Sequence, residues 1–395
     1  MNQIEARYPL RDYQQNWIEQ IVAAWNRGIR RVLAQLPTAA GKTVAVAHIS
    51  NDFFKEGKKV LVIAHRLELV EQAAEKLSAV IGSTVGIIKH GFPLHPERNI
   101  QVASIQTLAR RNLDEILPSV GLLICDEAHL ACASSYRQIF SFYQKAWVLG
   151  VTATPQRTDG QGFKDLFEHL VEGIPTSTLI QQGYLSQFRL FATDQTISTV
   201  GVKKSRGDFL ASELALAVNS QVGVADVFAN WRKYAAGLRT VIFASSLEHS
   251  KALAEHFLAQ GVAASHLDGD TDLSSRRDIL KRFRSGQTQV ITNYQILAEG
   301  YDCPELECVY CVRPTESQTL WLQMLGRVLR TSPNKSGATI IDLTDNWKKH
   351  GLPDDERSWS LEPASAKGEF HWSGLRQCSH CTHVFKPLSH AEFSR

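Results

Sequence analysis

The chain has 395 residues, of which 44% are hydrophobic and 21% are charged, a composition typical of a globular protein. This length excludes a single typical hydrophobic core, so two or three domains are expected. A net charge of +3 permits a nucleic-acid partner without arguing for one, because a local basic groove would be hidden in such a total.

The N-terminal residues 1–15 lack the apolar core of a signal peptide. No apolar run approaches the ~18 residues of a membrane span. Seven cysteines are scattered without the pattern of a disulfide framework, which predicts a reducing compartment. We therefore expect an intracellular, cytoplasmic protein with no membrane partner.

The first 180 residues alternate short apolar runs with amphipathic stretches such as residues 67–80, a rhythm that predicts parallel strands joined by helices. The expected strands are residues 32–36, 60–64, 100–103, 122–125 and 147–151. The resulting fold is a doubly wound parallel sheet, in which ligands bind beyond the carboxyl ends of the strands.

The same rhythm restarts after residue 235 and predicts a second α/β lobe. Its expected strands are residues 240–243, 263–266, 289–291, 308–312 and 338–341. The expected domains are an N-terminal lobe (1–180), a linker with the start of the second lobe (181–235), the second lobe (236–345) and a small C-terminal element (346–395).

The string PTAAGKT (Pro37–Thr43) stands between an expected strand and an expected helix. In such a turn, backbone N–H groups and a helix N-terminus point at phosphates. Lys42 would reach the β- and γ-phosphates, and the hydroxyl of Thr43 would hold Mg²⁺. The residues expected to surround the nucleotide are Pro37, Thr38, Ala39, Ala40 and Gly41. Leu36 stands where the full G-x-x-x-x-G-K-[ST] pattern has glycine.

A second string, DEAH (Asp126–His129), follows the apolar run LLIC, so Asp126 is expected at a strand end. Its carboxylate could hold Mg²⁺, and Glu127 could orient or deprotonate the attacking water. The alternative is a surface acidic pair that caps the next helix.

The third string, QMLGRVLR (Gln323–Arg330), places Arg327 and Arg330 three residues apart on an expected helix, where they share a face. Opposite a γ-phosphate they would stabilise charge in the transition state, an effect on the order of 10³–10⁵ in rate. Without the other motifs, an exposed basic helix face would be the better interpretation.

Together these strings resemble a superfamily 2 helicase over residues 8–345. The further matching segments are LRDYQ (10–14, the Q-motif), VLVIAHRLELVEQ (60–72, Ia), SIQTL (104–108, Ib), VTATPQRTDG (151–160, III), VIFASS (241–246, IV) and TNYQILAEGYDCPELE (292–307, V). The resemblance implies two tandem RecA-like lobes and a nucleic-acid-stimulated ATP hydrolase with ATP and Mg²⁺ as cofactors.

The resemblance also implies roles for single residues. The nucleotide-contacting set comprises Arg11 and Gln14 at the adenine, with Gly300 and Asp302 from the second lobe. The set that couples the nucleotide to the DNA side comprises His129, Thr152, Thr154 and Gln323. Ala39 stands where many relatives have glycine, and its methyl group would obstruct a backbone with φ > 0.

The combination of LRDYQ, AHR, TATPQRTDG, RGDF (206–209) and EGYDCPE is similar to the bacterial RadD branch, which lies near XPB and UvsW. RadD-like proteins are DNA-repair ATPases with a cysteine-rich zinc element, so the resemblance implies a DNA partner. The tail offers a single C-x₂-C half-site, Cys378 and Cys381. His371, His380, His383 or His390 could complete a Zn²⁺ site; a redox pair or an unligated remnant is the alternative.

Hydroxyl, amide and basic side chains at strand ends are candidates for phosphate contacts along a nucleic-acid strand. They are Arg66, Ser104, Gln106, Thr107, Ser245, Ser246, Thr292 and Asn293. Ser104 and Ser246 could equally be helix N-caps. For the basic loop with Lys203, Lys204 and Arg206, solvation is favoured over contact with duplex DNA, and for Trp321 core packing is favoured over base stacking.

The function expected from the sequence is an ATP-dependent DNA helicase or translocase that acts on single-stranded or branched DNA, in repair or recombination. An RNA-directed ATPase and a nucleotide-gated DNA-binding scaffold with little hydrolysis are the alternatives. No protein partner is indicated.

Overall fold

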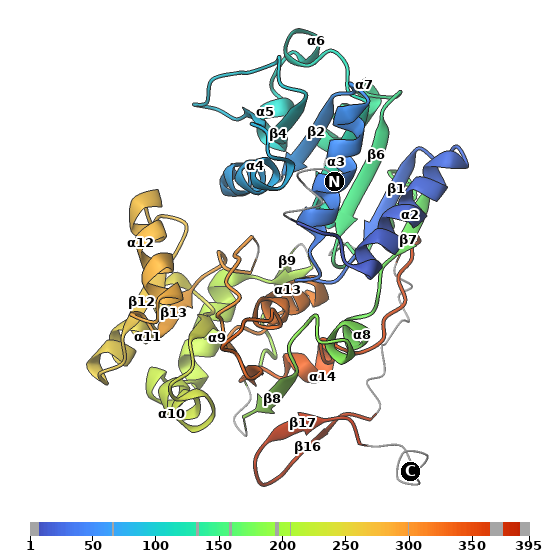
Figure 1. The fold of residues 1–395 in the computed structure, drawn as a ribbon. Coiled ribbons are helices and arrows are strands. Elements are labelled where there is room, and N and C mark those ends of the chain that lie inside the picture. The colour runs from blue at the N-terminus through green and yellow to red at the C-terminus, as the bar shows by residue number, and fades with distance from the viewer. Residues whose placement is uncertain are drawn as a thin grey trace. The chain divides into compact units, whose positions relative to one another are not determined.

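The computed structural model describes residues 8–64, 67–131, 134–157, 160–193, 197–205, 207–298, 300–363 and 374–387. The chain forms two compact units. Unit 1 comprises Met1–Pro175 and Arg357–Ala366, and unit 2 comprises Thr176–Glu356 and Lys367–Arg395 (Figure 1).

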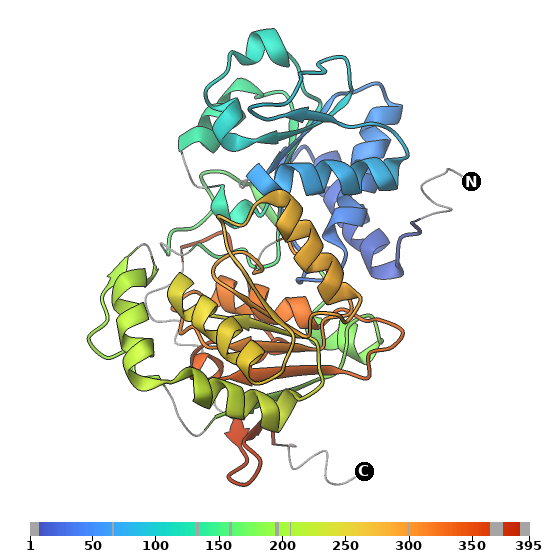
Figure 2. The same cartoon turned by 90° about the vertical axis from the view of Figure 1, so that its left-hand side faces the viewer.

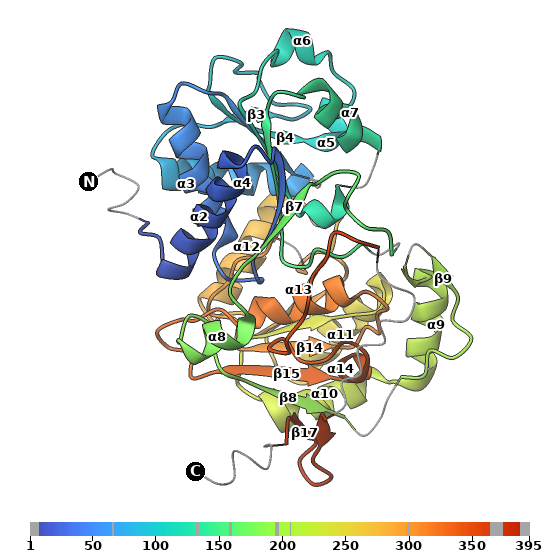
Figure 3. The same ribbon diagram turned by 90° about the vertical axis from the view of Figure 1, so that its right-hand side faces the viewer.

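Unit 1 is built on a seven-stranded parallel sheet in the order β3-β4-β2-β5-β6-β1-β7. The strands are β1 (Arg31–Gln35), β2 (Val60–Ala64), β3 (Gly86–Ile88), β4 (Ile100–Ser104), β5 (Leu122–Asp126), β6 (Trp147–Thr152) and β7 (His169–Glu172). Helices cover both faces (Figure 3). They are α2 (Asp12–Asn26), α3 (Lys42–Lys55), α4 (Leu67–Ile81), α5 (Ile105–Leu108), α6 (Leu113–Ile116) and α7 (Ser134–Phe142), with the 3₁₀ turn η1 (Ala128–Leu130).

Unit 2 contains an eight-stranded sheet in the order β12-β13-β11-β14-β15-β8-β17-β16. The strands are β8 (Phe188–Ala192), β11 (Thr240–Phe243), β12 (Ala264–Leu267), β13 (Val290–Asn293), β14 (Cys308–Cys311), β15 (Ala338–Asp342), β16 (Arg376–Gln377) and β17 (His383–Phe385). A separate ribbon pairs β9 (Lys204–Ser205) with β10 (Asp208–Phe209). The helices are α8 (Thr176–Gln181), α9 (Ala211–Gln221), α10 (Val224–Ala235), α11 (Leu247–Ala259), α12 (Leu273–Arg284), α13 (Gln318–Val328) and α14 (Asn346–His350).

The helices of unit 2 also lie on both faces of its sheet. Helices α10 and α11 lie in front of the sheet in Figure 2, and α13 lies in front of it from the opposite side in Figure 3. Strands covered on both faces need continuous apolar runs, and β2 and β14 are buried at every residue. The two doubly wound parallel sheets predicted from the sequence are therefore confirmed.

The unit boundary lies earlier than the sequence suggested. Strand β8, within the stretch 181–235 expected to hold the linker and the start of the second lobe, pairs in parallel with β15 from Phe188↔Ala338 to Ala192↔Asp342. Helices α9 and α10 contribute Leu214, Val218, Val227 and Trp231 to the core of unit 2. This stretch is therefore part of unit 2, because its apolar residues are buried there.

The expected C-terminal element, residues 346–395, is not one body in the described structure. Residues 357–363, here called the returning segment, belong to unit 1: Phe163 N donates to Leu361 O at 2.7 Å, and Leu361 joins the core. Strand β17 then pairs antiparallel with β8, so the β16–β17 hairpin extends the sheet of unit 2. The tail thus adds a residue to the core of unit 1 and two strands to the sheet of unit 2.

Candidate nucleotide site

The turn between β1 and α3 has an unusual backbone. Ala39 has φ 69° and Gly41 has φ 81°, both in the left-handed region. For a residue with a Cβ atom this region costs roughly 1–2 kcal/mol. The obstruction expected for the methyl group of Ala39 is therefore present as backbone strain. The Nζ of Lys42 donates to the carbonyls of Leu36 (3.0 Å) and Pro37 (3.3 Å), so the ammonium lies within the turn.

The start of α2 holds this turn from the side. The hydroxyl of Tyr13 donates to Ala40 O at 3.0 Å, and Nε2 of Gln14 donates to Ala40 O at 3.1 Å and Gly41 O at 3.3 Å. The sequence singled out Arg11 and Gln14 in this motif but missed Tyr13, whose partner lies 27 residues away. Adenine contacts by Arg11 and Gln14 stay a prediction; Gln14 is buried against the turn.

The two carboxylates of the DEAH string lie at the end of β5. Burial, reinforced by the negative charge of Glu127, raises the pKa of Asp126 to about 6, although the positive charge of Lys42 opposes the shift. Strand β6 pairs with β1 at Gln35↔Thr152 and with β5 at Asp126↔Val151, so the phosphate-binding turn and Asp126 follow strands that end at the same edge of the sheet. Glu127 has φ 50°, and its buried Oε2 lies 3.4 Å from His129 Nδ1 without making a hydrogen bond. Such a carboxylate pair suits a divalent cation, and Asp126 and Thr43 stay its predicted ligands.

His129 links this string to motif III. Its Nδ1 lies 3.1 Å from Thr152 Oγ1, which also accepts from Thr154 N at 3.2 Å. All three residues are buried. The coupling residues expected from the resemblance within unit 1 are thus brought together in the structure; their role in coupling stays a prediction.

In unit 2, Arg327 on α13 and Arg330 beyond its end converge on one loop. The helix that the sequence predicted to carry both arginines ends at Val328, so Arg330 lies outside it. Arg327 donates from Nε to Ala298 O (2.8 Å) and from Nη1 to Tyr301 O (3.1 Å). Arg330 donates from Nη1 to Tyr301 O (3.2 Å), and its Nε lies 3.0 Å from Asp302 Oδ1. These contacts join motifs V and VI, with Gly300 (φ 69°) between the carbonyls of Ala298 and Tyr301.

Further residues hold this group that the sequence did not indicate. The carbonyl of Arg330 accepts from Ser186 Oγ at 3.0 Å and from Lys335 Nζ at 2.8 Å. Burial lowers the pKa of Lys335 to about 8. Gln323 is buried on α13, and its Nε2 has no hydrogen-bond partner within the described parts of the chain.

Several side chains expected at the nucleic-acid backbone are buried and bonded internally. Ser104 caps α5 and Ser246 caps α11, which confirms the capping alternative for both. Ser245 Oγ lies 2.9 Å from His249 Nδ1, Thr292 donates to Ser250 O (2.7 Å) and Asn293 to Ile242 O (2.9 Å). Direct phosphate contact through these side chains is not available in this conformation, because they are almost fully buried.

The remaining nucleic-acid candidates have different surroundings. Gln106 is exposed and Thr107 is partly buried, so both reach the surface of unit 1. Arg66 and Arg206 lie outside the described residues. Lys203 and Lys204 are exposed and pair with Glu213 and Glu316, as a solvated loop would.

Two further predictions, one for Trp321 and one for the C-x₂-C pair of the tail, can be compared with the structure. Trp321 is fully buried and donates to Gly351 O at 2.9 Å, which confirms core packing. Cys378 and Cys381 lie at the turn of the β16–β17 hairpin, where the backbone N–H groups of Cys381 and His380 lower the pKa of Cys378. Within the described residues no third metal-binding side chain completes a site, so zinc is not supported. His371 and His390 lie outside those residues.

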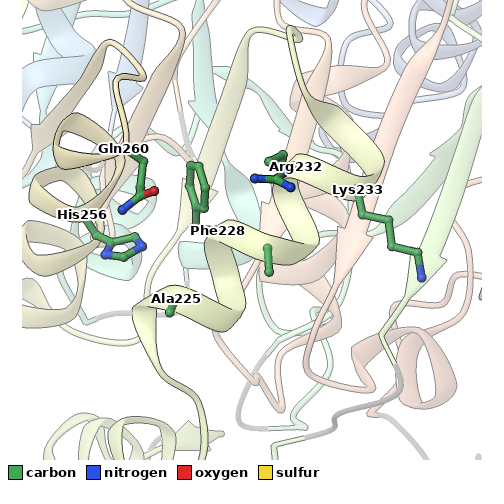
Figure 4. Close-up of a pocket in the computed structure, with 7 residues that line it drawn as sticks. Ala225, Phe228, Arg232, Lys233, His256 and Gln260 are labelled. Atoms are coloured by element: carbon green, nitrogen blue, oxygen red, sulfur yellow. The ribbon is translucent and has the colours of Figure 1, made fainter.

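A surface pocket of about 530 Å³ lies between α10 and α11 (Figure 4). Phe228, Arg232 and His256 line it, and no motif residue does. It is separate from the nucleotide site. In the stretches of chain that the structure describes, no helix is both long and apolar enough to cross a bilayer.

Comparison with known proteins agrees with this geometry. Residues 7–157 match the family "Type III restriction enzyme, res subunit", and residues 224–332 match "Helicase conserved C-terminal domain". A "51.5 kDa protein" of a Lactococcus phage is 31% identical over 90% of this chain and 75% of its own. The Saccharomyces cerevisiae protein IRC3, named as an ATP-dependent helicase, is 30% identical over 85% of this chain and 51% of its own.

Among solved structures, a fragment described as an HsdR subunit of a type I restriction enzyme from Vibrio vulnificus YJ016 shares the fold. The TM-score is 0.68 at 22% identity, over 87% of this chain and 66% of that one. The chain thus spans about half the length of IRC3 and two thirds of the HsdR fragment. With its paired motifs and two parallel-sheet units, the chain belongs to the superfamily 2 DNA helicases, which are nucleic-acid-dependent ATPases.

Proposed function

We propose that this chain is an ATP-dependent DNA translocase or helicase that acts inside the cell on single-stranded or branched DNA, in repair or recombination. The observation that carries the proposal is that each unit brings its own motif residues together. In unit 1, Lys42 lies within the turn that follows β1, and Asp126 ends β5 at the same edge of the sheet. In unit 2, Arg327 and Arg330 are fixed on one loop.

The proposed roles follow from these positions. Lys42 and the turn bind the phosphates, Thr43 and Asp126 hold Mg²⁺, and Glu127 accepts the proton of the attacking water. Bound Mg²⁺ would neutralise charge on the phosphate oxygens. Arg327 and Arg330 stabilise the charge that develops on the transferred phosphate. Different DNA affinities of the nucleotide-bound and nucleotide-free states would convert hydrolysis into movement.

The test is an ATPase assay with single-stranded DNA, duplexes, forks and four-way junctions, beside an unwinding assay on the same substrates. Lys42→Ala and Glu127→Gln should each abolish DNA-stimulated turnover without a change in thermal unfolding. Lys58→Ala, at an exposed lysine paired with Glu56, should leave turnover unchanged.

Three outcomes would contradict the proposal. Stronger stimulation by matched RNA strands would make the chain an RNA-directed ATPase. Tight DNA binding without hydrolysis would make it a scaffold. Full activity of Glu127→Gln would remove that carboxylate from the chemistry.

A further inference from the structure

The phosphate-binding turn combines a strained backbone with side-chain anchors. Ala39 has φ 69°, a conformation that disfavours any residue with a Cβ atom, and Gly41 has φ 81°. Such a conformation persists only where the surroundings fix it. The anchors are the side chains of Tyr13 and Gln14, which both donate to the carbonyl of Ala40.

The anchors determine where the N–H groups of the turn point. In a trans peptide unit the C=O and the N–H point in opposite directions. Because the carbonyls of Ala40 and Gly41 accept hydrogen bonds from α2, the N–H groups of Gly41 and Lys42 point away from α2. These are the groups that a phosphate-binding turn presents to its ligand.

The hydroxyl group of Tyr13 can donate in only one direction. Arg11 Nη1 donates to the Tyr13 oxygen at 3.1 Å, and a guanidinium cannot accept a hydrogen bond. The hydroxyl proton is therefore directed to Ala40 O, 3.0 Å away. Gln14 has another task, because its Oε1 accepts from Arg11 N at 3.0 Å and caps α2.

We propose that Tyr13 is a positioning residue of the nucleotide site. Its hydroxyl holds the turn with Ala39 and Gly41 in the left-handed region, so that the N–H groups of Gly41 and Lys42 are turned toward the phosphates. The inference rests on the proposed ATP site and adds a residue that acts through the main chain, without touching the nucleotide. The effect of the Tyr13 hydroxyl on nucleotide binding should depend on the strain at Ala39, because a turn that adopts this conformation without strain needs no anchor.

This dependence defines the experiment, a double-mutant cycle of Tyr13→Phe and Ala39→Gly. Steady-state DNA-stimulated ATPase gives kcat and KM for ATP, and titration with a fluorescent ATP analogue gives Kd. Tyr13→Phe keeps the buried ring and removes two hydrogen bonds, the one donated to Ala40 O and the one accepted from Arg11 Nη1, so we expect KM and Kd to rise about fivefold with kcat within about twofold. In the Ala39→Gly background the same substitution should change them by less than about twofold, because glycine adopts φ > 0 without strain.

Tyr143→Phe is the matched control. It removes a buried tyrosine–carbonyl hydrogen bond in unit 1, from Tyr143 to Leu117 O at 2.7 Å, away from the turn. It should lower the melting temperature and leave KM and Kd unchanged. If Tyr13→Phe changes only the melting temperature, Tyr13 is structural and the proposal is wrong.

Two other results would also overturn the proposal: the same loss of affinity in both backgrounds, which would mean that the hydroxyl acts without the turn, and no loss in either. The parent protein separates these results from a failure of the proposed function. If the parent chain hydrolyses no ATP but the analogue titration shows the expected cycle, the enzymatic function fails while the positioning role stands.

Discussion

The two units hold their motif residues in different ways. In unit 1 the phosphate-binding turn and the DEAH string use main chain in the left-handed region, at Ala39, Gly41 and Glu127. In unit 2, Arg327 of α13 and Arg330, just after that helix, extend side chains that bind the carbonyls of Ala298 and Tyr301. Unit 1 thus depends on backbone conformation, and unit 2 depends on the guanidinium groups. The comparison teaches that substitutions in the phosphate-binding turn of unit 1 should affect nucleotide binding, whereas substitutions of the arginines of unit 2 should affect the chemical step.

The largest effect is expected at Arg327. Arg327→Ala should lower kcat by on the order of 10³ and leave the Kd for ATP within a few-fold, because its charge acts on the transition state. Arg327→Lys should not restore the rate, since an ammonium cannot reproduce the planar fork that contacts both carbonyls. Stopped-flow hydrolysis beside nucleotide titration checks this. A loss of binding equal to that of Lys42→Ala would remove the contrast between the units.

The next effect is the loss of stability of unit 2 as the pH falls. Burial lowers the pKa values of His249 and His350, both in unit 2, to about 4. Unfolded histidine binds a proton near pH 6.5, so the unfolded state holds more protons as the pH falls from about 6.5 to 4, and stability is lost there. The full difference in pKa between the unfolded and folded states corresponds to about 3 kcal/mol of unfolding free energy per histidine. Asp342 of the same unit has its pKa raised to about 6, and it offsets one histidine below that pH.

In unit 1 the pH dependence of stability has the opposite sign at Asp126. The pKa of Asp126 is raised to about 6, so its protonation below that pH favours the folded state. Hydrogen exchange at pH 7 and pH 5 should therefore show loss of protection first in unit 2. His350→Gln should flatten the pH dependence of unfolding by about one proton. First loss of protection in unit 1 would contradict the assignment.

The next prediction concerns the packing of the returning segment against Gly162 of unit 1. A Cβ atom on Gly162 would lie 2.3 Å from Leu361 O and 2.6 Å from Pro363 N, both main-chain atoms. Gly162→Ala should therefore displace residues 357–363 and cost about 1–3 kcal/mol of stability. Gly269→Ala, at a position with no atom within 4 Å, is the control and should be nearly neutral. Equal melting temperatures for the two variants would show that the segment is not held there.

The smallest effect is expected for Ala39→Gly alone. Relief of roughly 1–2 kcal/mol of left-handed strain is opposed by about 0.5–1 kcal/mol of added chain entropy in the unfolded state. The net change should be a stabilisation of at most about 1 kcal/mol, visible in denaturant unfolding. Destabilisation would mean that the methyl group makes favourable contacts that outweigh the strain.

The sequence determined the sheets and the order of the motifs. Strands such as β2 and β14 are continuous apolar runs, because a parallel strand must be buried on both faces. Lys42 and Asp126 were likewise predictable, since each follows such a run and the carboxyl ends of parallel strands meet at one edge. Strand β8 was missed: it is only partly buried, and it is defined by pairing with β15, about 150 residues later in the chain.

Only the tertiary structure decided which polar groups are free to act. Ser104, Thr292 and Asn293 have the chemistry of phosphate contacts, yet their partners within the fold bury them. Tyr13 and Lys335 look ordinary in the sequence, but each donates to a carbonyl beside a motif. The physical reason is that a local pattern fixes burial and periodicity, whereas a hydrogen bond between distant residues depends on the packing that brings them together.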